Sequence, residues 1–67
     1  MENVSKILIE LRKEKGLSQQ QVADFLKIDR SNYSKYERGK LEVNITMLRE
    51  LSKLYGVSTD YILGLEK

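Results

Sequence analysis

The stretch SQQQVADFLKIDRSNYSKYERGK, residues 18–40, predicts two short helices joined by a tight turn, and this arrangement decides the fold. The first helix is expected at residues 19–26, where apolar side chains recur at helical spacing and form one stripe: Val22, Ala23 and Leu26. The second helix is expected at residues 30–37. Gly39 follows it, at the place where a residue in the left-handed conformation commonly ends a helix.

Each of these two helices follows a side chain that can cap it. Ser18 precedes the first helix, and its hydroxyl can accept a hydrogen bond from an otherwise unpaired N–H of the opening turn. Asp29 precedes the second helix and offers a carboxylate for the same purpose. The side chains therefore predict where both helices begin.

Polar side chains cover the outer face of the helix expected at residues 30–37, whereas Tyr33 and Tyr36 share its inner side. The outer set is Ser31, Ser34, Lys35 and Arg38, with Asn32 toward one edge of that face, and Arg30 opens the helix and can reach forward from its tip. Arg and Lys donate to guanine, Asn can pair with adenine and Ser is adaptable, so this face suits reading base edges in a DNA major groove. An ordinary surface helix is also polar outside, and this helix alone leaves both interpretations open.

The composition limits the possible functions. A chain of 67 residues is expected to form a single domain, residues 1–67. It contains no Cys and no His, which excludes disulfides, thiolate metal sites and nucleophile–base pairs built on either residue. We therefore predict no catalytic residues, no metal site and no cofactor. The amphipathic, charged start is neither a signal peptide nor a membrane span, which favours a cytoplasmic protein without a membrane partner.

Positive charge is concentrated in one part of the chain. The net charge is +2, but residues 27–40 hold five basic and two acidic side chains, so this segment carries more positive charge than the whole chain. The excess lies on the polar helix and the loop after it. Charge placed there favours contact with the phosphate backbone of nucleic acid.

The remaining sequence predicts further helices and no strand. There is no proline, the four glycines fall near helix ends, and strand-like alternation does not persist. A first helix is expected at residues 4–15, with Val4, Ile7, Leu8 and Leu11 on its inner side. A fourth begins after the cap Asn44, with an inner face of Ile45, Leu48, Leu51, Ser52 and Tyr55. A fifth follows Ser58 and closes the core with Ile62 and Leu63. The fold class is all-α, a compact five-helix domain.

Two segments together, LRKEKGLSQQQVADFLKIDRSNYSKYERGK at residues 11–40 and LSKLYGVSTDYIL at residues 51–63, resemble the Cro and phage-repressor helix-turn-helix family, also called the xenobiotic-response-element-like family. Four short motifs occur in order at matching spacing, and together they disfavour an unrelated helical bundle. They are K-G-L-S-Q, V-A, S-K-Y-E-R-G-K and L-Y-G-V-S-x-D-Y. The resemblance implies a lambda-repressor-like domain whose DNA-binding helix-turn-helix unit spans about residues 18–38. Two positions depart from the family pattern: Lys27 replaces a usual turn glycine, and Val43 an often-used proline.

The resemblance also implies roles for individual residues. The base-contacting positions are Arg30, Ser31, Asn32 and Lys35. The phosphate-contacting positions are Gln19, Arg38 and Lys40, and we add Ser34, which lies on the same exposed face. The partner is double-stranded DNA. Since base-facing residues vary freely in such families, the operator sequence is not implied.

One ion pair is expected to hold the polar helix in place. Glu37 lies on the inner side of that helix, and a carboxylate drawn toward the core needs a cation. Arg12 follows the core residue Leu11 and sits at the border of the first helix's apolar stripe. The family resemblance points to the same two positions. We therefore predict a partly buried Arg12–Glu37 salt bridge.

The function predicted from the sequence is a DNA-binding transcriptional regulator, a repressor or controller that binds a palindromic operator as a homodimer. Apolar residues beyond the core face predict a dimer interface at Leu54, Tyr61 and Leu65. No small-molecule ligand is evident, and an enzyme would need a pocket and a general base for which only scattered carboxylates and tyrosines are available. A protein-interaction module or antirepressor on the same fold is the alternative, but the outer face of the polar helix is not apolar.

Overall fold

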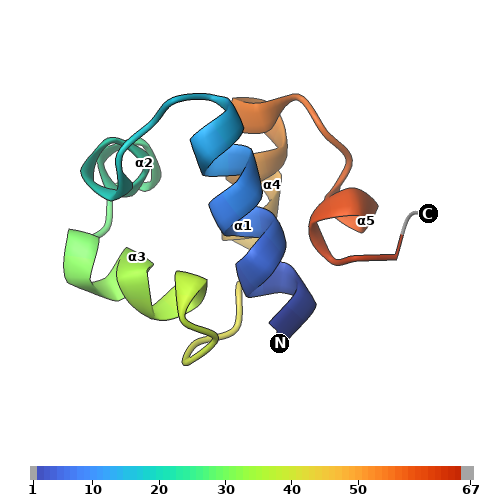
Figure 1. Ribbon diagram of the computed structural model, residues 1–67, viewed down its shortest axis with the longest axis horizontal. Helices are drawn as coiled ribbons and strands as arrows, with labels where there is room; N and C mark the ends of the chain where they lie inside the picture. The colour runs from blue at the N-terminus through green and yellow to red at the C-terminus, as the bar shows by residue number, and fades with distance from the viewer. Residues whose placement is uncertain (1, 66–67) are drawn as a thin grey trace.

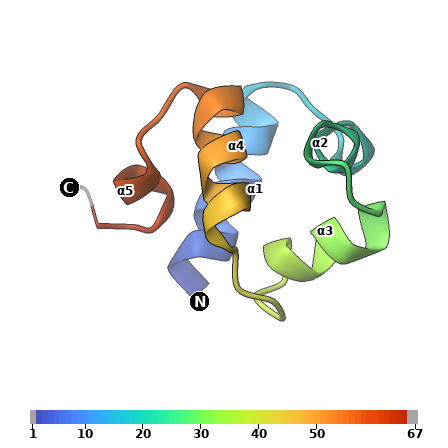
Figure 2. The same ribbon diagram turned by 180° about the vertical axis from the view of Figure 1, so that it is seen from behind.

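The computed structural model describes residues 2–65, and within that range it contains helices and no strand (Figure 1). In chain order the helices are α1 Glu2–Glu14, α2 Gln19–Leu26, α3 Arg30–Glu37, α4 Ile45–Tyr55 and α5 Thr59–Ile62. Figures 1 and 2 show α2 and α3 at one end of the molecule and α5 at the other, with α1 and α4 between them. The predicted all-α, five-helix fold is confirmed.

All five helices contribute to one apolar core. Its buried side chains are Val4, Leu8, Leu11, Val22, Ala23, Tyr33, Met47, Leu51 and Ile62. The inner stripes predicted for the first two helices supply all the buried residues of α1 and α2. Within the described part of the chain, no helix combines the length and apolar composition that crossing a bilayer requires.

The inner face of α4 is the predicted one in part: Leu51 is buried, and Leu48 and Tyr55 pack partly against the core. Met47 and Leu51 are buried, whereas Ile45 in the first turn is 75% exposed. Leu54, expected on the far side and assigned to a dimer interface, instead packs partly against the core. The reason is spacing: Met47, Leu51 and Leu54 stand four and three residues apart, so they share one helix face and form the core stripe.

Side-chain caps open three of the helices as predicted. Ser18 Oγ accepts from Gln21 N at 3.1 Å, and Gln21 Oε1 accepts from Ser18 N at 2.8 Å, which together make a capping box. The side chains of Asn44 and Ser58 cap α4 and α5 by accepting from Met47 N and Tyr61 N. Asp29 occupies the cap position of α3, but its side chain makes no capping hydrogen bond, so that part of the prediction is wrong.

The turn between α2 and α3 passes through Lys27, whose backbone is left-handed at φ 61° and ψ 41°. Within the described residues, the other positive φ angles belong to glycines. Lys27 stands where the family usually has a glycine, and it adopts the left-handed backbone that glycine would adopt without strain. A side chain in this conformation costs about 1–2 kcal/mol relative to the right-handed region.

Lys27→Gly is therefore expected to raise the free energy of unfolding by about 1 kcal/mol, because glycine adopts positive φ without strain. Urea denaturation followed by circular dichroism measures the change. Lys27→Ala is the matched control, because it also removes the charge near the α2 C-terminus but keeps the strain. Equal midpoints for the two variants would show that backbone strain contributes nothing at this turn.

Candidate nucleic-acid interface

The outer face of α3 is exposed and polar over its whole length. Arg30, Ser31, Asn32 and Lys35 are exposed, as is Arg38 just past the helix, and Ser34 is half-buried. On the opposite side of the same helix Tyr33 is fully buried and Glu37 is 6% exposed. The structure thus brings the predicted base-contacting residues together on one face of a helix whose other face is fixed in the core.

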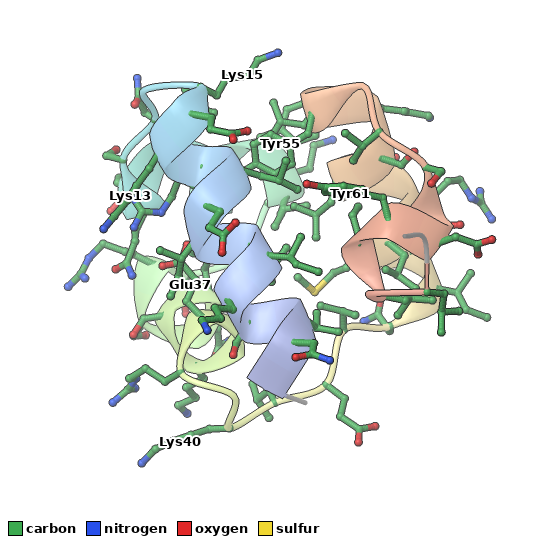
Figure 3. All side chains as sticks on the ribbon, turned by 45° about the vertical axis from the view of Figure 1, so that its right-hand side comes forward. Lys13, Lys15, Glu37, Lys40, Tyr55 and Tyr61 are labelled. Atoms are coloured by element: carbon green, nitrogen blue, oxygen red, sulfur yellow. The ribbon has the colours of Figure 1, made fainter. Side chains whose placement is uncertain are left out.

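The loop after α3 carries Lys40 next to this face. Gly39, at φ +74°, turns the chain so that Lys40 N donates to Lys35 O at 2.8 Å and Gly39 N to Tyr36 O at 3.2 Å. These bonds tie the loop backbone to the end of α3. The Lys40 side chain extends away from the molecule in Figure 3, as a contact with a DNA phosphate would require.

Glu37 forms the predicted ion pair with Arg12. Arg12 Nε donates to Glu37 Oε2 at 2.7 Å and Arg12 Nη2 to Glu37 Oε1 at 3.2 Å, a two-pronged contact between α1 and α3. The two side chains are 16% and 3% exposed. Arg12 Nη1 also donates to Leu17 O at 3.0 Å, so the same guanidinium holds the loop between α1 and α2. Figure 3 shows Glu37 beside α1.

Gln19, predicted to contact phosphate, has part of its hydrogen-bonding capacity engaged inside the protein. Its Nε2 donates to Glu37 Oε1 at 3.0 Å. This bond was not predicted, because nothing in the spacing of Gln19 and Glu37 along the chain marks them as neighbours. The buried polar cluster therefore joins α1, the start of α2 and the end of α3 through three side chains: Arg12, Gln19 and Glu37.

The protonation of this cluster favours the charged pair. Burial by itself raises the pKa of Glu37, but the hydrogen bonds from Arg12 and Gln19 outweigh it and hold that pKa below its usual value of 4.5. The hydrogen bond to Glu37 raises the pKa of Arg12. Glu37 is therefore an anion, and Arg12 a cation, across the physiological pH range.

Two phenol groups lie in the interior close to this pair. Burial raises the pKa of both Tyr33 and Tyr55, and charge on Glu37 raises them further. The two hydroxyl oxygens are buried and make no hydrogen bond of normal geometry within the described residues. The Tyr33 hydroxyl is still near enough to favour the charged form of Glu37.

The residues predicted for a dimer interface do not form one uniform surface. Tyr61 is 41% and Leu65 70% exposed, near the α5 end of the molecule. Leu54 packs partly against the core, so less of its side chain is available for a partner. Tyr61 belongs to α5 and Leu65 follows it in the chain, and Figure 2 shows α5 at the opposite end of the molecule from α3.

The fold and the polar face of α3 define a helix-turn-helix domain. A model of the helix-turn-helix family matches residues 8–62, and the chain belongs to this family. This confirms the family resemblance read from the sequence.

Bacterial relatives carry the same domain. The chain is 54% identical over 52 residues to the SPbeta prophage-derived uncharacterized HTH-type transcriptional regulator YonR of Bacillus subtilis, covering 78% of this chain and 48% of that protein. It is 42% identical over 62 residues to the HTH-type transcriptional regulator ImmR of Bacillus subtilis, covering 92% and 49%. It is 38% identical over 60 residues to the HTH-type transcriptional activator BcrR of Enterococcus faecalis, covering 90% and 29%. The chain thus spans about half the length of the first two relatives and 29% of the length of the third.

Proposed function

We propose that this domain binds double-stranded DNA at specific sequences and that the protein carrying it regulates transcription. The observation that carries the proposal is the exposed α3 face of Arg30, Ser31, Asn32 and Lys35 on a helix anchored from behind by Tyr33 and Glu37. A rigid helix with donors and acceptors on its free side can enter the major groove and hydrogen-bond to base edges. The names of the relatives, all HTH-type transcriptional regulators, support it.

In this proposal one group of residues contacts the bases and a second group contacts the phosphates. Arg30, Ser31, Asn32 and Lys35 contact bases and give specificity, whereas Gln19, Ser34, Arg38 and Lys40 contact the phosphates and set the position of α3 in the groove. The domain acts as a single unit over residues 1–67, with the DNA-contacting part at about residues 18–38 and the loop that follows.

Lys35→Ala is expected to weaken binding mainly to the preferred sequence, by about 1–3 kcal/mol, because a base contact is lost. Lys40→Ala is expected to weaken binding to all sequences alike and to lower the salt slope by about one unit. Sites selected from a random duplex pool supply the preferred sequence, and titrations on it and on random duplex at several salt concentrations measure both effects.

Lys53→Ala is the matched control, because Lys53 is an exposed lysine on α4, away from the α3 face. Identical behaviour of the Lys35 and Lys40 variants would contradict the division into base and phosphate contacts. If the wild-type protein enriches no duplex at all, the DNA-binding proposal fails and a protein-binding module takes its place.

We also propose that two copies bind together, on a palindromic operator whose half-sites lie about one helical turn apart. Tyr61 and Leu65, exposed near the α5 end, and the accessible part of Leu54 supply apolar surface for pairing. Leu65→Asp is expected to shift the protein toward the monomer in sedimentation velocity, with Lys53→Ala unchanged. A wild-type protein that stays monomeric at high concentration, with and without operator DNA, would rule out the pairing.

A further inference from the structure

The side-chain amide of Gln19 lies between the buried ion pair and the protein surface. Its Nε2 donates to Glu37 Oε1 at 3.0 Å, while the Gln19 residue as a whole is half-buried. Glu37 is almost fully enclosed, with a side chain 3% exposed. The amide therefore has one side in the interior and one side toward solvent, at the first residue of α2.

The acceptor that holds this amide is itself fixed. Arg12 grips both Glu37 oxygens, at 2.7 and 3.2 Å, and Arg12 is held in turn by Leu17 O at 3.0 Å. A carboxylate fixed in this way can hold the long Gln19 side chain in one rotamer, since a flexible side chain otherwise samples several. A primary amide has two N–H groups, and the bond to Glu37 occupies one of them.

We propose that Glu37 is a positioning residue for DNA backbone recognition: it holds Gln19 so that the second N–H of the amide meets a backbone phosphate at the start of α2. This inference rests on the proposed DNA-binding function. It gives the buried ion pair a role beyond tying α1 to α3, because the same carboxylate orients a donor toward the ligand. A preoriented donor loses less conformational freedom when the phosphate arrives.

The neighbouring Gln20 provides a matched comparison on the same helix. Its Nε2 donates to Asp24 Oδ1 at 2.9 Å, an exposed contact along the surface of α2. Gln20 therefore has the same side chain one residue away, with no connection to the ion pair. Gln20→Ala is expected to leave DNA affinity within about twofold of wild type, because the exposed Gln20–Asp24 hydrogen bond contributes little. Twofold is therefore the change in affinity below which a variant counts as unaffected.

The sharpest test changes the DNA rather than the protein. Single phosphates of the selected duplex are replaced, one at a time, by neutral methylphosphonates. Wild-type protein is expected to lose about tenfold in affinity at one phosphate in each half-site through the Gln19 contact, the size expected for a hydrogen bond to a charged group. In Gln19→Ala that loss disappears, while the other sensitive phosphates keep theirs. In Gln20→Ala the whole profile stays as in wild type.

The positioning role of Glu37 is tested with Arg12→Met/Glu37→Met. This double variant removes the acceptor without leaving a buried charge unpaired, and such replacements often preserve the fold. The loss in affinity caused by the methylphosphonate at the Gln19-dependent phosphate is expected to shrink from about tenfold to a few-fold. Adding Gln19→Ala to the double variant is expected to lower DNA affinity less than it does in the wild-type protein. If this double variant does not fold, Arg12→Met/Glu37→Gln, which also leaves no charge unpaired and keeps a weaker acceptor of the same shape at position 37, is expected to give an intermediate loss.

Two results would overturn the inference: no phosphate whose effect depends on Gln19, or a Gln19-dependent phosphate that is unchanged when Glu37 is replaced. Both require that wild-type protein binds the unmodified duplex. Failure of that binding would instead refute the proposed function, so the two failures are distinguishable.

Discussion

Replacing Tyr33 by alanine is expected to lower the free energy of unfolding by about 3–5 kcal/mol, the usual cost of removing a buried aromatic side chain and leaving a cavity. Tyr33 is fully buried and is among the largest enclosed side chains of the core. A domain of 67 residues has a total stability of only roughly 3–10 kcal/mol. The variant should therefore lose between about a third of its stability and all of it, seen as a much lower urea midpoint or as no folded baseline, and DNA binding should fall with the folded fraction.

Tyr33→Phe is the control, since it keeps the ring and removes only the hydroxyl. That hydroxyl is buried without a hydrogen bond of normal geometry, so its removal is expected to change the free energy of unfolding by less than about 1 kcal/mol in either direction. A loss as large as that of the alanine variant would show that the hydroxyl, rather than the packing of the ring, holds α3 in place.

Breaking the Arg12–Glu37 pair is expected to cost about 3 kcal/mol when either partner alone is replaced by methionine, because the other charge remains in a mostly enclosed site. Replacing both together should cost much less. The double-mutant cycle then gives a coupling energy well above ~1 kcal/mol. It should persist in high salt, unlike that of an exposed pair, which is worth ~0–1 kcal/mol and is screened. A coupling near zero would mean that the two charges act as solvated groups.

The same pair makes the free energy of unfolding depend on pH in the acidic range. The folded protein holds the pKa of Glu37 below its usual value of 4.5, so the ionised carboxylate stabilises the fold above that pH. This contribution is lost as the pH falls below about 4.5 toward the folded-state pKa, because the unfolded chain takes up the proton first. In urea denaturation at a series of pH values, Glu37→Met should lack part of the acid destabilisation seen in the wild-type protein.

The features that the sequence predicted best are those set by local chemistry. The bounds of α2 and α3 agree with the predicted ranges, because a capping serine marks the start of α2 and Gly39, a glycine with positive φ, follows α3. The Arg12–Glu37 contact was predictable because an acidic residue on an inner helix face requires a nearby cation. The helix ends follow from residues within one or two turns of helix, and the ion pair follows from the charge of one inner residue.

The features that the sequence missed depend on how whole helices face one another. Ile45 is exposed and Leu54 packs partly against the core, the reverse of what was expected for each. Because α4 has apolar residues around much of its circumference, helical spacing alone fits more than one inner face, and packing against the other helices selects among them. The Gln19–Glu37 bond joins residues 18 apart in the chain, and no periodicity connects them. The roles of the α3 residues toward DNA remain predictions, since they depend on a partner as well as on the fold.

The arrangement of the helices also has a kinetic consequence. Helices adjacent in the chain pack on each other, α2 on α3 and α4 on α5, so many native contacts close short loops. Helical domains dominated by such contacts fold within about microseconds to milliseconds. The sequence has no proline, so no prolyl isomerisation, which takes tens of seconds, can delay the process. A domain of small stability built in this way regains its native fold almost as soon as it loses it.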